Sequence, residues 1–225
     1  MTLLVLALGF AVQAQQPAPA PQQPPLRTES VGGRNITPAH DTYDEDFFAS
    51  DARARIAIQS YGSCAASRSG SAATDVLRRD FTTRQYQQAL QVLSRNNQDC
   101  FRRRGRMRSS NLLFAGAMAE HLIEQSPEPL NARLARAASR PAAQAFSASD
   151  RMAGCIVRSV PDDVARLFAT EVASESEMAA AQALAPAAAQ CNAGGQPIQI
   201  SPAGLRAMLA TAAFRTLHRS AEGGN

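Results

Sequence analysis

The four cysteines are the residues whose type and spacing point most directly to chemistry. Cys64 lies 36 positions before Cys100. Cys155 lies the same 36 positions before Cys191. In a reducing compartment cysteines often indicate metal binding or catalysis, whereas in an oxidising compartment they form disulfides. Because the chain has no Cys-x-x-Cys pair and its three histidines are scattered, we predict no metal site and no cofactor.

A second chemical feature is the basic stretch CFRRRGRMRSS, which begins at Cys100. Five of its residues are arginines: Arg102, Arg103, Arg104, Arg106 and Arg108. The planar guanidinium group suits bidentate contacts with phosphate or carboxylate, so the stretch is a candidate anion-binding site. Outside it, the other 18 of the 23 basic residues are balanced by 19 acidic residues. The stretch therefore accounts for the net charge of +4.

Three interpretations of this arginine stretch are open. Its side chains can be solvated, as runs of like charge often are. They can bind an anionic lipid or polysaccharide of the cell envelope through charge attraction. They can also pair with His40–Asp46, a segment that carries four acidic residues. Nucleic acid is a less expected partner, because Phe101 is the one aromatic residue in the stretch that could stack on a base.

The N-terminal sequence predicts export. Thr2–Val12 is an apolar run without a charge, and Val12 and Ala14 stand at the −3 and −1 positions of a cleavage site. The run is shorter than the roughly 20 residues that cross a bilayer, and it lacks the basic residue that usually precedes it. We expect a signal peptide at 1–14, a Pro/Gln-rich linker at 15–40, and a periplasmic or extracellular mature protein with no transmembrane segment.

The equal cysteine spacing is part of a longer internal match. A shift of 91 positions places Cys64 on Cys155, and apolar residues then coincide at many further positions without a gap. Such self-similarity predicts two tandem copies of one unit. Four cysteines allow three connectivities, and the duplication selects one bridge within each copy. The predicted disulfides are Cys64–Cys100 and Cys155–Cys191.

Each copy is predicted to contain about four helices, and strand patterns are almost absent, so the fold class is all-α. The copies should occupy 41–128 and 129–221, with a disordered tail at 222–225. Helix starts are predicted from cap residues. The third helix of each copy should start after Thr83 and Ser174, and the fourth after Ser110 and Ser201. The first helices are expected at about 46–66 and 142–157, and a linking helix at 130–138. Met118 and Leu209 lie on matching apolar stripes and should be buried equivalently.

Two other clusters are weaker candidates for binding. The acidic residues of Asp41–Asp46 could attract calcium, but they lack the ligand spacing and the glycine of a known calcium loop. His121 and Glu124 lie three positions apart on one predicted helix, which is typical of an exposed pair. The sequence has no Gly-x-Ser-x-Gly, His-Glu-x-x-His, P-loop or dinucleotide-binding motif, so it nominates no catalytic residue.

The second copy carries a resemblance to a known group of proteins. Its segments CIVRSVPDDVARLF, ALAPAAAQC and ISPAGLRAMLATAAF end at Phe168, Cys191 and Phe214. They resemble uncharacterised exported α-helical proteins of alphaproteobacteria, in which a cysteine is followed by a basic turn, a proline-led helix and a second cysteine. The resemblance extends to both copies. It implies architecture and export, and no activity, because the group has none assigned.

Two functions of different class follow from the sequence. The first is a non-catalytic exported protein of the cell envelope that acts by interaction or scaffolding, which suits a duplicated, disulfide-bonded unit without a catalytic set. The alternative is a binder of anionic lipid or polysaccharide through Arg102–Arg108. An enzyme is the third possibility, and it would require a polar pocket between the two copies.

Overall fold

The computed structural model describes residues 42–101, 109–192 and 200–218, with side chains described from residue 51 onward. All of these residues belong to one compact unit, His40–Asn225. The predicted signal peptide, the Pro/Gln-rich linker, the arginines of Arg102–Arg108 and the C-terminal tail lie outside the described residues, as do the side chains of the acidic segment that precedes residue 51.

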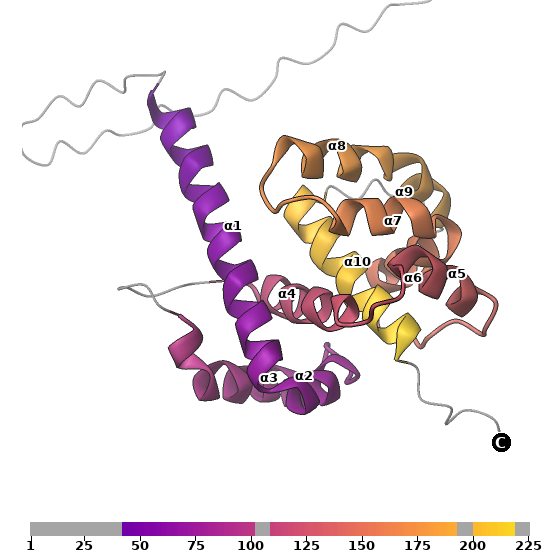
Figure 1. The fold of residues 1–225 in the computed structure, drawn as a ribbon, viewed down its shortest axis with the longest axis horizontal. Coiled ribbons are helices and arrows are strands. Elements are labelled where there is room, and N and C mark those ends of the chain that lie inside the picture. The colour runs from indigo at the N-terminus through magenta and orange to yellow at the C-terminus, as the bar shows by residue number, and fades with distance from the viewer. Residues whose placement is uncertain (1–41, 102–108, 193–199, 219–225) are drawn as a thin grey trace, which may run out of the picture. The chain divides into compact units, whose positions relative to one another are not determined.

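The described part of the chain contains helices and no strand, which confirms the all-α fold class (Figure 1). We refer to α1–α4 as the first half and to α5–α10 as the second half. The helices of the first half, with one 3₁₀ turn η1 between α3 and α4, are α1 (Thr42–Arg68), α2 (Gly70–Leu77), α3 (Arg84–Asn96), η1 (Gln98–Cys100) and α4 (Asn111–Glu124). Those of the second half are α5 (Leu130–Ala138), α6 (Ala148–Ser159), α7 (Pro161–Phe168), α8 (Glu175–Ala183), α9 (Ala185–Cys191) and α10 (Pro202–Leu217).

Both predicted disulfides are present. Cys64–Cys100 joins α1 to η1, and Cys155–Cys191 joins α6 to the last residue of α9. In each bridge the two Cα atoms are 5.7 Å apart. Closing a loop of this length restricts the unfolded chain and should stabilise the fold by roughly 3–4 kcal/mol per bridge.

The four predicted cap residues all start a helix. The side-chain oxygens of Thr83, Ser110, Ser174 and Ser201 each accept a hydrogen bond from the backbone N–H three residues later. Each bond satisfies an N–H that the first turn of a helix leaves without a partner. The predicted linking helix also has the bounds observed for α5.

Two helix predictions were wrong. The first helix of the second copy was expected from 142, but α6 begins at Ala148 because Ser147 caps it by accepting from the N–H of Asp150. The Asp150 carboxylate in turn accepts from the N–H of Phe146, which fixes the non-helical entry. The third helix of the second copy was expected to be continuous. It is divided into α8 and α9 before Pro186, whose ring provides no backbone N–H to continue the helix.

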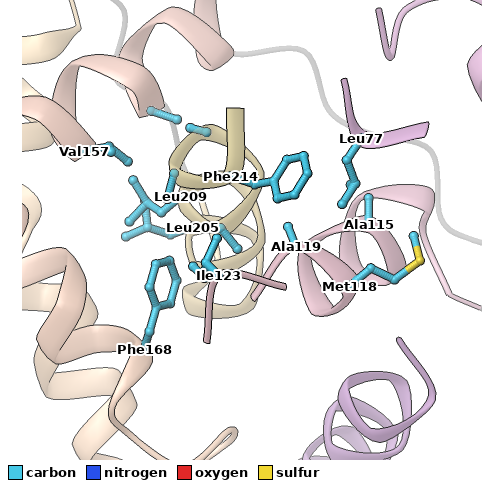
Figure 2. Packing of buried hydrophobic residues seen from close by; sticks show 14 of the residues in the cluster. Leu77, Ala115, Met118, Ala119, Ile123, Val157, Phe168, Leu205, Leu209 and Phe214 are labelled. Carbon is cyan, nitrogen blue, oxygen red and sulfur yellow. The ribbon is translucent and has the colours of Figure 1, made fainter. Parts of the chain in front are cut away.

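One hydrophobic core runs through both halves. Met118 of α4 and Leu209 of α10 are both 0% exposed, as predicted. Figure 2 shows that this core draws side chains from α2, α4, α6, α7 and α10. The two units predicted at 41–128 and 129–221 therefore share their apolar interior.

Helix α4 is the central element, because it packs against both α1 and α10 (Figure 1). Two glycines permit these close approaches. A Cβ atom added to Gly62 of α1 would lie 2.4 Å from the Cβ of Ala117 on α4. A Cβ added to Gly116 of α4 would lie 2.5 Å from the Cβ of Ala207 on α10. Real Cβ atoms do not approach so closely, so the two crossings require glycine at these positions.

Helix ends in the two halves follow the offset of 91 residues that separates Cys64 from Cys155. Helices α1 and α6 end at Arg68 and Ser159. Helices α2 and α7 occupy Gly70–Leu77 and Pro161–Phe168, and the cap residues described above stand at the same offset.

Candidate functional sites between the two halves

A network of four charged side chains links the halves across the core. It consists of Arg55 on α1, Glu120 on α4, Glu177 on α8 and Arg206 on α10, and we call it the buried ion network. Glu120, Glu177 and Arg206 are 3%, 1% and 5% exposed. Two positive and two negative charges make the network neutral. Such pairing is what allows charged groups to be buried at all.

Arg206 is the centre of this network. Its guanidinium donates to Glu120 from Nε at 2.9 Å and from Nη2 at 2.5 Å, and Nη1 donates to Glu177 at 3.3 Å. Further bonds reach the hydroxyl and the carbonyl of Thr170 and the carbonyl of Phe168. Burial by itself lowers the pKa of Arg206, but the hydrogen bond and the charges of the two glutamates outweigh it and raise the pKa. Arg206 therefore stays charged, and its donors are committed to the fold.

Glu177 connects the network to α1. It accepts from Arg55 Nη2 at 2.5 Å and from the backbone N–H of Ala173 at 2.9 Å. Ala173 has a φ of 64°, the left-handed region that costs a residue with a side chain about 1–2 kcal/mol. Beside the network is a cavity of about 20 Å³ lined by Arg55, Glu120 and Arg206 among others. Arg55 Nε is the one fully buried side-chain nitrogen or oxygen of the described residues without a hydrogen-bond partner, and the cavity is large enough for one water molecule.

A larger cavity of about 260 Å³ lies where the N-terminal ends of α3 and α4 meet α6 and α10. We call it the junction pocket. Residues from both halves line it: Phe81, Tyr86, Asn111, Leu112, Ser149, Asp150, Met208, Thr211 and Arg215. Most of the surface of its wall is apolar, and six of the nine lining residues carry a polar or charged group. Binding sites for small molecules combine these two features.

An ion pair between Asp150 and Arg215 forms the polar side of the junction pocket. Both side chains are largely buried, at 6% and 10% exposed. Asp150 is held by the α6 cap, and the Arg215 guanidinium lies 5.8 Å from the ring centres of Phe81 and Phe146. Phe81 meets Phe146 edge to face at 5.9 Å. The pair is neutral, and its arginine is further stabilised by contact with two aromatic faces.

Tyr86 contributes a further polar group to the junction pocket, beside those of Asn111, Ser149 and Thr211. The residue is 6% exposed, and burial raises the pKa of its phenol to about 12 against the opposing charge of Arg215. The phenol is therefore neutral and is a hydrogen-bond donor at ordinary pH. Within the described residues its hydroxyl has no hydrogen-bond partner, and it is not among the fully buried atoms. The side chain lines the pocket, and its hydroxyl keeps some exposure.

The predicted site residues have different outcomes. The four cysteines are brought together as two pairs. The arginines of Arg102–Arg108 lie outside the described residues, so anion binding by them stays a prediction. His121 contacts Gln125, the next residue on the same face of α4, through a 3.4 Å approach of the two nitrogens. Among the described residues, no three metal-ligating side chains lie together.

Sequence reasoning missed both the buried ion network and the junction pocket. One signal was present in the sequence, because Glu120 directly follows the apolar run Phe114–Ala119. In the structure all seven of these residues are buried. Arg206 likewise lies within a largely apolar helix. A charge on a buried face requires a partner, but that partner is 86 positions away in the chain. No local spacing could have identified it.

Comparisons with protein-family models, with curated proteins and with solved structures found no match. None of the helices in the described ranges is long and apolar enough to cross a membrane.

Proposed function

We propose that this chain is an exported, non-catalytic interaction protein of the cell envelope that binds a small molecule in the junction pocket. The observation that carries the proposal is the pocket itself, a cavity of about 260 Å³ lined by aromatic and aliphatic side chains from both halves. Binding sites for small molecules are typically concave and mostly apolar, with a few placed polar groups. Its volume exceeds that of engineered apolar cavities of about 150 Å³ that bind benzene.

The chemistry of the pocket favours binding over catalysis. Asp150 accepts bonds from Arg215 and from the backbone of Phe146, so its carboxylate is occupied. Arg215 is paired and packed against aromatic rings. A general acid or base needs a proton that it can exchange near neutral pH, whereas the phenol of Tyr86 has a pKa of about 12. These groups can orient a ligand, and they are poorly suited to transfer protons.

Export is supported by the disulfides. Two bridges in one chain are typical of oxidising compartments such as the periplasm and the extracellular space. The predicted signal peptide at 1–14 agrees with this location.

We also propose that the halves arose by duplication. Equal bridge spacing, equal cap positions and matching ends of α1 and α6 support this interpretation. The junction pocket would then be an interface between two copies, a place where neither copy alone could form a site.

Binding of two neutral probes of similar shape, cumene and acetophenone, tests the proposed function. Ligand-observed NMR on the oxidised protein should detect saturable binding of both. Leu112→Trp adds bulk to a pocket residue that is 37% exposed and should weaken binding roughly tenfold, since overpacking costs about 1–3 kcal/mol. Val92→Trp, at a 53% exposed position of α3 outside the pocket, is the matched control and should bind as the wild type does. Absence of binding to the wild type, or equal binding by both variants, would contradict the proposal.

A second candidate function is binding of anionic lipid or polysaccharide through Arg102–Arg108. The observation in its favour is that the stretch begins beside a disulfide-linked residue, Cys100, and ends before Ser110, the cap of α4. The described residues that flank it, Cys100 and Ser110, are therefore held by the fold. Vesicles of anionic lipid should bind the wild type at low salt and release it at high salt, because exposed charges are screened. A variant with glutamine at all five arginines should not bind, and equal binding by both proteins would reject this candidate.

A further inference from the structure

We infer that the junction pocket selects a neutral amphipathic molecule, with one or two flat apolar rings and an oxygen that accepts a hydrogen bond from the Tyr86 hydroxyl. The inference rests on the proposed function, because it names the class of ligand for the same site. Three properties of the pocket support it in turn: its volume, its charge and the free donor of Tyr86.

The volume limits the ligand to a small ring system. The cavity measures about 260 Å³. This lies above the roughly 150 Å³ of a benzene-binding cavity and just below the range of about 300–1,000 Å³ for drug-sized ligands. Phe81, Leu112 and Met208 supply the apolar walls. Rings prefer edge-to-face or offset contacts with such aromatic walls.

The charge of the pocket disfavours an ionic ligand. Among the described residues that line it, Asp150 and Arg215 are the only charged ones, and they pair with each other. A carboxylate ligand would have to displace Asp150 from Arg215, and an ammonium ligand would have to displace Arg215 from Asp150. Either exchange would leave one charge buried without a partner, which is strongly unfavourable. A neutral molecule avoids this penalty.

Tyr86 determines which neutral molecule fits best. Its ring is fixed by burial and by an edge-to-face contact with Phe81 at 6.5 Å between ring centres. Its hydroxyl lacks an acceptor in the part of the chain that the structure describes. A carbonyl, ether or hydroxyl oxygen on the ligand would provide one. Sites built to hydrogen-bond a ligand discriminate against analogues without the matching group, because a polar atom is otherwise left unpaired.

Tyr86→Phe, which removes the hydroxyl and keeps the ring, is the deciding variant. Acetophenone carries an acceptor oxygen and cumene has a similar shape without one. The variant should bind acetophenone roughly fivefold more weakly, the worth of about one neutral hydrogen bond, and cumene as the wild type does. Tyr61→Phe is the matched control, because the Tyr61 hydroxyl bonds to Ser94 and does not line the pocket. It should leave both affinities unchanged.

The outcomes separate the inference from the proposed function. If the wild type binds neither probe, the proposed function fails. If the wild type binds both but Tyr86→Phe weakens both equally or neither, the pocket binds ligands and the role of Tyr86 is wrong. Benzoate, an anionic probe of similar shape, should bind more weakly than acetophenone, and tighter binding of benzoate would overturn the preference for a neutral ligand.

Discussion

Replacing Arg206 with methionine perturbs the buried ion network at its centre while keeping an unbranched apolar side chain. The change removes both donors to Glu120, which is 3% exposed and has no other hydrogen-bond partner among the described residues. Glu177 keeps its bonds from Arg55 and from the N–H of Ala173. One buried charge is therefore left without compensation. We expect a loss of about 3–5 kcal/mol in the free energy of unfolding.

Glu120→Leu should lower the free energy of unfolding by a similar amount. Arg55 and Arg206 then carry two positive charges against the one negative charge of Glu177. The double variant is the informative one. It keeps the neutral ion pair of Arg55 and Glu177 and loses the bonds from Arg206 to Thr170 and Phe168. Its cost should be below that of either single variant, because replacing both members of a buried ion pair by apolar side chains leaves no unpaired charge and is often close to neutral. The double variant should thus be more stable than either single variant.

Urea unfolding followed by far-ultraviolet circular dichroism measures these differences, since the chain has no tryptophan. Arg166→Met is the control. Its ion pair with Asp163 is exposed, with 63% of the arginine side chain accessible, and should contribute less than about 1 kcal/mol. Single variants that cost less than about 1 kcal/mol, or a double variant that costs the sum of both, would refute the assignment of these charges to one coupled network.

Three further predictions concern packing and ionisation. Gly116→Ala should destabilise the fold by about 1–3 kcal/mol, because its new Cβ would meet the backbone of Ala207 at 2.6 Å. Gly154→Ala has no atom within 4 Å of its new Cβ and should stabilise α6 by roughly 0.5–1 kcal/mol. Thermal melts of the two variants would compare these effects. Because the folded pKa of Tyr86 is raised from 10.0 to about 12, its contribution is present below pH 10 and lost as the pH rises to 12; an ultraviolet titration of Tyr86→Phe should lack the last tyrosinate step. Burial and nearby arginines lower the pKa of His218, so stability should fall as the pH drops through the unfolded value of 6.5, and His218→Gln should remove that dependence in acid unfolding curves.

The sequence predicted what local chemistry decides. Cap residues such as Ser110 and Ser201 locate helix starts because their hydroxyls satisfy backbone groups three positions away. The disulfide pairing followed from equal spacing. The start of α6 was misplaced because the local cap formed by Ser147 and Asp150 was not recognised in the sequence.

The candidate site could not be predicted, for a physical reason. The junction pocket depends on how α3 and α4 meet α6 and α10. Its lining residues are spread along the chain from Phe81 to Arg215. The sequence pattern states which face of a helix is apolar, but it does not state where two apolar faces fail to fill the space between them. No sequence pattern around Tyr86 distinguishes it from an ordinary core residue.

The order of the disulfides bears on how the chain matures. The first cysteine pairs with the second and the third with the fourth, and no bridge crosses from one half to the other. As a polypeptide emerges from a translocation pore with its N-terminus first, an oxidant that joins each cysteine to the next available one would produce the native pairing directly. Under the proposed export, this chain should therefore mature with a thiol oxidase alone, without a disulfide isomerase. The disulfide of the first half would form before that of the second half. The two halves would then be held together by noncovalent contacts, which a reductant does not break.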